Sequence, residues 1–100
     1  MIYLITYDIE NNTIRTRIAK ALERYGCERL QKSVFIGELN PKKYHQLYTE
    51  LSAETSDKNF TDTDNIIILP TEAHLIDALR LIGTNQTLVK LKNKPNTLFF

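Results

Sequence analysis

The first apolar run of the chain spans Ile2 to Tyr7 and stops at a carboxylate, Asp8. Its β-branched, aromatic and aliphatic side chains occupy both alternating faces, which predicts a central strand covered on both sides. The residues that follow Asp8 are polar and suit the start of a helix. An acid between a strand and a helix lies at the rim of a sheet, where a ligand or a metal ion can reach it.

A helix is predicted after this strand, because apolar residues recur at spacings of three and four. Asn12 or Thr13 can cap its start, and Gly26 can adopt the left-handed conformation that ends it. Its apolar stripe consists of Ile14, Ile18, Ala21, Leu22 and Tyr25. Arg15 and Arg17 lie in the first turns, so we expect both of them close to Asp8. From the pattern alone, a solubilising helix face is the favoured interpretation of these arginines.

The extended run from Glu28 to Leu39 exceeds an ordinary strand of about five or six residues. We therefore expect a bend or tight turn near residues 31–33, which divides the run into two strands. Asn40 and Pro41 then predict a helix start, since asparagine can cap and proline suits the first helical position. The apolar stripe of this second helix consists of Tyr44, Leu47, Tyr48 and Leu51.

The second half of the chain is less regular. Residues 52–64 are polar and acidic and predict a surface loop, while Ile66 to Leu69, ended by Pro70, predicts another buried strand. Residues 72–82 fit either a helix or the end of a strand. Residues 88–91 and 97–100 are short β-prone pieces, and we expect the apolar end of the chain to pack on its own sheet or on a partner's.

Composition and charge narrow the class of protein. With 42% hydrophobic and 25% charged residues, 100 residues make one soluble domain without a membrane span, and we expect it to dimerise. Residues 1–43 hold eight Lys or Arg and five Asp or Glu, so this segment is basic. Residues 44–77 hold one Lys or Arg and seven Asp or Glu, whereas residues 78–100 hold four Lys or Arg and no Asp or Glu. This distribution permits a face that binds polyanions, and a solvated mixed surface accounts for it equally well.

Several kinds of site are made improbable by the sequence. Cys27 is the only cysteine, so an internal disulfide and a Cys-based metal site are excluded, and a reducing, cytoplasmic setting fits. His45 and His74 have no neighbouring His or Cys, and we interpret them as solvated or capping residues. No glycine-rich phosphate loop, HExxH pair or nucleophile elbow occurs.

Four short motifs follow one another in order: Tyr7-Asp8-Ile9, Arg15-Thr16-Arg17, Tyr25-Gly26 and Arg29-Leu30-Gln31-Lys32-Ser33-Val34-Phe35. As an ordered set they resemble the small CRISPR-associated protein family that is the second of the two proteins shared by CRISPR adaptation systems. The resemblance covers residues 1–83. It implies an α+β, ferredoxin-like βαββαβ fold with an extra C-terminal strand exchanged or packed across a homodimer. Residues 28–39 then form two strands, residues 72–76 a helical turn and residues 77–83 a strand, with residues 84–100 as a dimerisation extension of a single domain, 1–100.

The same resemblance implies that Asp8 faces its symmetry mate across the dimer and holds one divalent ion, Mg²⁺ or alternatively Mn²⁺. Magnesium prefers oxygen ligands and is often held by one or two carboxylates together with waters and substrate phosphates. Many family members carry further acids after the aspartate, whereas this chain has Asn11 and Asn12 there, with Glu10 just before. Asparagine oxygens can bind a cation but add no charge.

Other residues match basic and polar positions of the family. Arg15, Arg17 and Arg29 would steady a phosphate and its developing charge, because a guanidinium can form bidentate contacts. Ser33 would position water or the metal. Tyr7 and Phe35 match further motif positions, and we interpret Phe35 as a core residue.

Three functions follow as hypotheses. The first is a homodimeric, Mg²⁺-dependent endoribonuclease or endodeoxyribonuclease that acts in CRISPR spacer acquisition and antiviral defence. The second is a non-catalytic homodimeric scaffold that binds DNA and the partner integrase of the adaptation complex, as the basic segment from Arg80 to Lys94 suggests. The third is a toxin-like ribonuclease on the same fold that acts outside CRISPR.

Overall fold

The computed structural model describes residues 1–93. The strand order in its single sheet is β2-β3-β1-β4, and all neighbouring strands are antiparallel. None of the helices in this range is long and apolar enough to span a membrane. The elements are β1 (Ile2–Asp8), α1 (Asn12–Arg24), β2 (Glu28–Gln31), β3 (Val34–Glu38), α2 (Pro41–Ala53), the 3₁₀ helix η1 (Glu54–Ser56), β4 (Asn65–Thr71), α3 (Ala73–Ala78) and α4 (Gln86–Asn93). The order βαββαβ over residues 2–71 confirms the ferredoxin-like fold.

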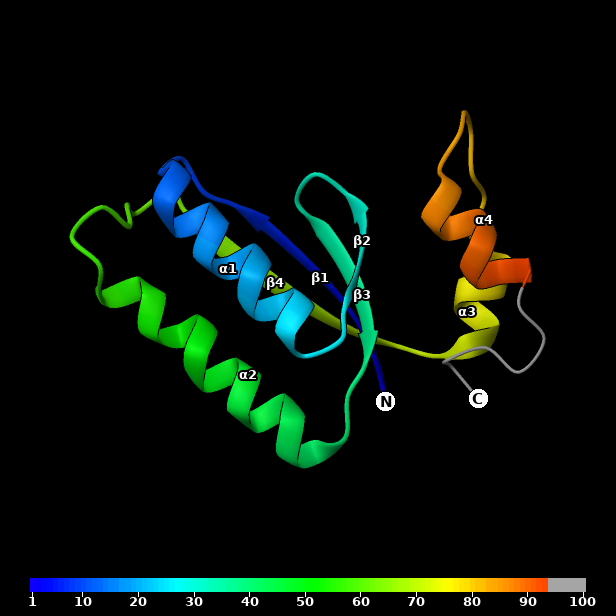
Figure 1. Cartoon of the computed structure of the whole chain (residues 1–100), viewed down its shortest axis with the longest axis horizontal. Helices are drawn as coiled ribbons and strands as arrows, with labels where there is room; N and C mark the ends of the chain where they lie inside the picture. The colour runs from blue at the N-terminus through cyan, green and yellow to red at the C-terminus, as the bar shows by residue number, and fades with distance from the viewer. Residues whose placement is uncertain (94–100) are drawn as a thin grey trace.

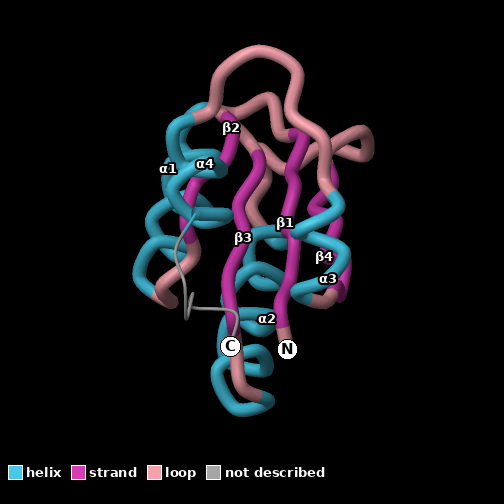
Figure 2. Tube along the Cα trace, turned by 90° about the vertical axis from the view of Figure 1, so that its right-hand side faces the viewer, coloured by secondary structure: helices cyan, strands magenta, loops and turns pink. Residues whose placement is uncertain are grey.

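Both faces of β1 are covered, as its apolar pattern predicts. On one face, α1 and α2 bury Ile5 and Tyr7, which are 0% and 6% exposed (Figure 1). On the other face, α3 and α4 cover part of the sheet, and Ile2 packs in one cluster with Leu91 of α4 (Figure 2). The molecule therefore has three layers, with the sheet in the middle.

The helix starts follow from capping side chains, with one correction. Asn11, and not Asn12 or Thr13, caps α1, since its Oδ1 accepts a hydrogen bond from the Ile14 N–H at 3.0 Å. Asn12 is unsuited to this role because its own side chain accepts a hydrogen bond from Arg15. Asn40 caps α2 as predicted, with its Oδ1 2.8 Å from the Lys43 nitrogen. Gly26 has a φ of +87° and ends the α1 segment as expected.

β4 is longer than the sequence predicts. The strand continues through Pro70 to Thr71, and Pro70 lies opposite Tyr3 in the register. Proline is compatible with this position because β4 is an edge strand with ladder hydrogen bonds on one side only. The preceding polar segment is also partly regular, since α2 extends to Ala53 and η1 follows it.

The segment after β4 differs most from the prediction. Residues 77–83 do not form the predicted strand, because α3 ends at Ala78 and residues 79–85 are irregular. Residues 88–91 are helical, and this places Leu88 and Leu91 on one buried face of α4. Among residues 1–93 no strand pairs with this segment, and as a helix it covers its own sheet. Packing across a homodimer stays a prediction, and residues 97–100 lie outside the described range.

Gly37 in β3 allows a close approach between two strands. A Cβ atom at this position would lie 2.6 Å from the Sγ of Cys27 and 3.2 Å from its Cα. Cys27 is only 6% exposed, and burial raises the pKa of its thiol to about 11. The raised pKa favours the protonated thiol at neutral pH, and the burial agrees with a packing role for Cys27.

We expect Gly37→Ala to lower the free energy of unfolding by about 1–3 kcal/mol, because the added methyl group overlaps Cys27. Urea unfolding would measure the change. Cys27→Ala in the Gly37→Ala background should recover part of the loss, since it removes the sulfur but leaves the backbone contact. Equal stability of Gly37→Ala and the wild type would contradict the predicted overlap.

Candidate functional site

Asp8 lies at the end of the central strand, at the rim of the sheet. It is the last residue of β1, pairs with Asn65 of β4 in the register and is exposed. Its neighbour Tyr7 points into the core beneath α1 and α2, so Asp8 lies on the opposite face of the sheet. The position at a strand end agrees with the prediction from the sequence.

Asp8 is a single candidate ligand for a divalent cation. Within residues 1–93 no group of three or more His, Cys, Asp and Glu side chains is placed to hold a metal ion. One chain offers a single carboxylate at Asp8, with the Asn65 amide on the adjacent strand. This donor set fits Mg²⁺, which needs only one or two carboxylates besides waters and phosphates, if a second copy supplies the other carboxylate. His45 is exposed and His74 lies 3.2 Å from Glu72, so both are surface histidines.

A groove between α1 and the β2–β3 hairpin collects most of the other predicted residues. Its volume is about 390 Å³. It brings together Arg15, Arg29, Ser33 and Tyr7, whereas Asp8 and Arg17 are not among its lining residues. Two further cationic residues of the lining, Lys20 and Lys32, were not selected as site residues from the sequence. We call this groove, with four cationic side chains and the single acid Glu23, the basic groove.

Arg29 is the best placed of the predicted arginines to contact a phosphate. Its guanidinium carbon lies 4.9 Å from the centre of the Phe35 ring, which is a cation–π contact. Phe35 is fully buried, which confirms it as a core residue. Among residues 1–93 the Arg29 side chain has no hydrogen-bond or ion-pair partner, so its N–H groups can donate to a ligand.

The turn between β2 and β3 is tied to the end of β1. The backbone N–H of Tyr7 donates to the Ser33 carbonyl at 3.1 Å, and the Tyr7 hydroxyl donates to the Lys32 carbonyl at 3.4 Å. Ser33 and Lys32 are thereby held at the mouth of the basic groove. Lys32 could have been found from the sequence, because it lies in the predicted tight turn beside Ser33.

Arg15 is largely engaged with the backbone. Its Nη1 donates to the carbonyls of Ile9 at 2.9 Å and Glu10 at 2.7 Å, and its Nη2 donates to Asn12 Oδ1 at 2.8 Å. These contacts use three of the five N–H donors of the guanidinium. Arg15 therefore braces the turn that follows Asp8, and its capacity to bind a phosphate is correspondingly smaller. The oxygen of Asn12 is occupied by the same contact.

Arg17 does not lie beside Asp8 as the sequence predicts. Its Nη2 lies 2.6 Å from Glu54 and 2.8 Å from Asp57, at the end of α2 and just after η1. Hydrogen bonds to Glu54, then to Asp57, raise the pKa of Arg17. The backbone N–H of Asn59, followed by Arg17, lowers the pKa of Asp57. The position of Arg17 in the sequence gave no sign of these partners, which lie 37 and 40 residues further along.

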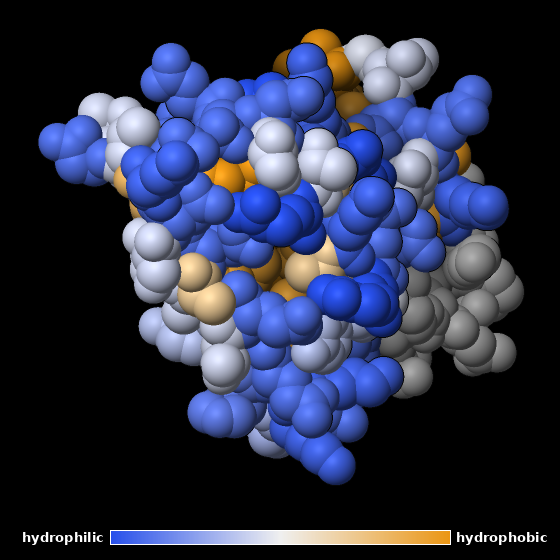
Figure 3. Space-filling view, turned by 60° about the vertical axis from the view of Figure 1, so that its left-hand side comes forward, coloured by the Kyte–Doolittle hydropathy of each residue, from blue (hydrophilic) through white to orange (hydrophobic). Residues whose placement is uncertain are grey.

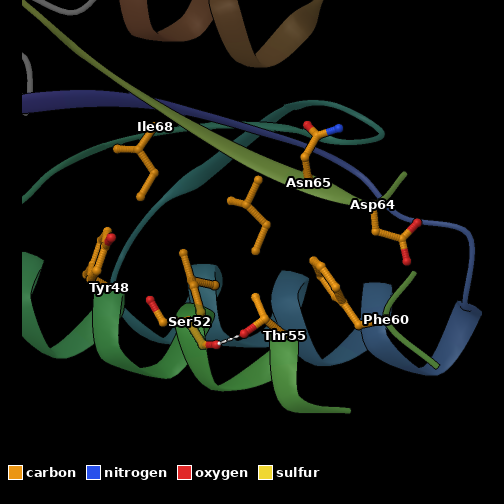
Figure 4. A pocket seen from close by; sticks show the side chains of 9 residues that line it. Tyr48, Ser52, Thr55, Phe60, Asp64, Asn65 and Ile68 are labelled. Atoms are coloured by element: carbon orange, nitrogen blue, oxygen red, sulfur yellow. Dashed lines mark hydrogen bonds between the residues drawn. The ribbon is translucent and has the colours of Figure 1, made fainter. Parts of the chain in front are cut away.

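A second cavity of about 240 Å³ lies between α2 and β4 (Figure 4). Leu51, Phe60, Ile66 and Ile68 form its apolar wall, and Asp64 is its only charged lining residue. It has no cationic side chain, so it offers no contact for a phosphate. The surrounding surface is mainly hydrophilic, with a small apolar hollow (Figure 3).

Comparisons with known proteins agree with this arrangement. The family model described as CRISPR associated protein Cas2 matches residues 1–77. A Pyrobaculum aerophilum protein named CRISPR-associated endoribonuclease Cas2 2 is 35% identical over 83 residues, which are 83% of this chain and 87% of the relative. An Archaeoglobus fulgidus protein named CRISPR-associated endoribonuclease Cas2 1 is 40% identical over 70 residues, 70% of each chain. A Thermoproteus tenax protein named CRISPR-associated endonuclease Cas1/endonuclease Cas2 fusion is 35% identical over 52 residues, which are 52% of this chain and 20% of the relative.

Two solved structures have the same fold. Streptococcus pyogenes Cas2 at pH 6.5 aligns with a TM-score of 0.69 and 23% identity, over 83% of this chain and 100% of that chain. A hypothetical protein from Thermus thermophilus aligns with a TM-score of 0.65 and 26% identity, over 84% and 92%. Because the family model covers residues 1–77 and the Pyrobaculum relative shares 35% identity over most of both chains, the protein belongs to the CRISPR-associated Cas2 family.

Proposed function

We propose that the protein is a homodimeric, metal-dependent endoribonuclease of CRISPR adaptation, with Asp8 of each copy holding a shared divalent ion. The observation that carries this proposal is the exposed Asp8 carboxylate at the end of β1, at the rim of the sheet. The names of the Pyrobaculum and Archaeoglobus relatives favour RNA as the substrate. Mg²⁺ is the expected ion, and duplex DNA is the second substrate to test.

In this proposal Asp8 binds the metal ion, and the cationic residues of the basic groove bind the nucleic acid. Asp8 supplies a carboxylate oxygen to the ion, and the bound ion would polarise a phosphodiester and lower the pKa of a water that attacks phosphorus. Arg29 lies with Tyr7 on the sheet face opposite Asp8, so it would donate to phosphates of the bound strand other than the one at the ion, and the ammonium groups of Lys20 and Lys32 attract further phosphates along the basic groove. The reaction is hydrolysis, in which water adds to phosphorus and the P–O bond to the leaving nucleotide breaks.

An apolar area beside Asp8 supports the homodimer. Ile67 and Leu69 of β4 are 58% and 54% exposed. Both lie on the sheet face that carries Asp8, because they pair in the register with Thr6 and Leu4. Large apolar side chains gathered on one face mark an interaction surface. A second copy packed there would cover this surface and bring the two Asp8 residues together.

We expect Asp8→Asn to reduce cleavage of single-stranded RNA by about 100-fold or more in Mg²⁺ or Mn²⁺, because the amide adds no charge for the ion. Cleavage should be measured on purified protein whose mass in solution has been determined. Asp62→Asn is the matched control, since Asp62 is an exposed acid that lies far along the chain in another loop. Unchanged cleavage by Asp8→Asn, or a strictly monomeric active protein, would refute the proposed site.

Arg29 and Arg17 should differ in their effect on RNA binding. Arg29→Ala should lower the slope of log affinity against log salt by about one per copy, because one phosphate contact is lost. Arg17→Ala should leave the slope unchanged, since two carboxylates already occupy its guanidinium. Fluorescence anisotropy over a salt series measures both slopes. An equal loss of slope in both variants would show that Arg17 leaves its acids to bind RNA.

The second candidate function is a non-catalytic scaffold that binds DNA and a partner integrase. Lys90 and Lys92 are exposed on α4, outside the basic groove. The Thermoproteus relative, named as a fusion of Cas1 and Cas2, is consistent with such a partner. In this case the Asp8 carboxylate would be dispensable for assembly.

For the scaffold, charge reversal at Lys90, Lys92 and Lys94 should weaken duplex DNA binding by about tenfold or more at moderate salt. Asp8→Asn should leave DNA binding and complex formation intact. Anisotropy with labelled duplex DNA, repeated at several salt concentrations, provides the measurement. Binding that is insensitive to these lysines and to salt would exclude the proposed phosphate contacts.

A further inference from the structure

We infer that Asp64 is a positioning residue for Asp8: its carboxylate holds the turn that follows Asp8 and thereby sets how tightly Asp8 holds a divalent ion. The inference rests on the proposed function, in which Asp8 binds the ion. It concerns a residue outside the basic groove and 56 positions along the chain from Asp8.

The contact continues the pairing of β1 and β4 past its last backbone pair. In the register, that last pair is Asp8 and Asn65. Asp64 directly precedes Asn65, and its Oδ1 accepts a hydrogen bond from the backbone N–H of Glu10 at 3.1 Å. The side chain of one strand thus holds the backbone of the other where the ladder has ended.

The Asp64 carboxylate is itself held in one orientation. Its Oδ2 accepts a hydrogen bond from the Thr61 backbone N–H at 2.8 Å, so both oxygens are engaged. In Figure 4 the carboxylate points away from Phe60 and towards the connection between β1 and α1. The hydrogen bond from Thr61, followed by that from Glu10, lowers the pKa of Asp64.

Arg15 holds the same turn from the helix side. Its Nη1 donates to the carbonyls of Ile9 and Glu10, at 2.9 and 2.7 Å. Asp64, in the loop before β4, therefore holds the Glu10 N–H of this turn, and Arg15 of α1 holds the carbonyls of Ile9 and Glu10. Asp8 is the residue immediately before this turn. Contacts that orient a metal ligand typically change metal affinity by about 10–100-fold when they are removed.

The test is Mn²⁺ binding to the full-length protein, followed by electron paramagnetic resonance of the free ion. Asp64→Ala should weaken Mn²⁺ binding by about tenfold and lower kcat for RNA cleavage, while KM for RNA changes by less than about twofold. Asp62→Ala is the matched control, because it removes a carboxylate from the same loop. The Asp62 side chain has no hydrogen-bond partner among the described residues, so this variant should leave Mn²⁺ affinity unchanged. In the Asp8→Asn background, Asp64→Ala should cause no further loss of Mn²⁺ binding.

Amide hydrogen exchange reports on the turn without any metal. Asp64→Ala should speed the exchange of the Glu10 amide by roughly fivefold or more, and Asp62→Ala should not change it. If Asp64→Ala does not fold, Asp64→Asn decides the question. The asparagine keeps one acceptor oxygen, so it should give a smaller loss of Mn²⁺ affinity and a smaller rise in Glu10 exchange.

Two results would overturn the inference. One is wild-type Mn²⁺ affinity in a folded Asp64→Ala or Asp64→Asn protein. The other is an equal weakening in Asp62→Ala, which would make the effect one of charge and not of position. Failure of the proposed function is separate, because it would appear as unchanged Mn²⁺ binding and cleavage in Asp8→Asn.

Discussion

The pairing of β1 with β3 on one side and β4 on the other fixes where the candidate functional residues lie. Ile5 is opposite Phe35 in one register and Ile68 in the other, and it is fully buried. A slip of one residue would turn this side chain to the other face of the sheet, so burial of the core strongly specifies the register. The same register brings Asp8 out at the end of the strand beside Asn65, on the face opposite Tyr7.

The three arginines of the motifs have different tasks because their surroundings compete for the guanidinium. Arg17 meets two carboxylates, and Arg15 meets two backbone carbonyls and an amide oxygen. Arg29 lies over the ring of Phe35, a contact that uses none of its N–H donors. A phosphate can therefore bind Arg29 without displacing an existing partner, whereas at Arg17 it must compete with acids from another part of the chain.

The second face of the sheet links the fold to assembly. α3 and α4 bury Ile2 and Ile36 through Ile76 and Leu91, and the Asn85 side chain donates to the Leu30 carbonyl of β2. These helices leave the β4 side of the same face exposed, which is also the side of Asp8. The helices and a second copy therefore cover complementary parts of this face in the proposed dimer. A divalent ion between two carboxylates would further favour that assembly, since it removes the repulsion between them.

The sequence by itself determined the doubly covered strand, the hairpin at residues 28–39, the Asn40 cap and the acid at the strand end, because all four are local signals. The tertiary structure decided the rest, because the deciding contacts join residues far apart in the chain. Glu54 and Asp57 form ion pairs with Arg17, and the Asp64 side chain accepts a hydrogen bond from Glu10, 54 positions away. Pro70 is tolerated in β4 because β4 is an edge strand. Residues 72–82 fit either a helix or the end of a strand by periodicity, and residues 88–91 are β-prone, but the apolar sheet face that they cover is packed by the helices α3 and α4. Local patterns specify which side chains are apolar, polar or charged, but only folding specifies which of them meet.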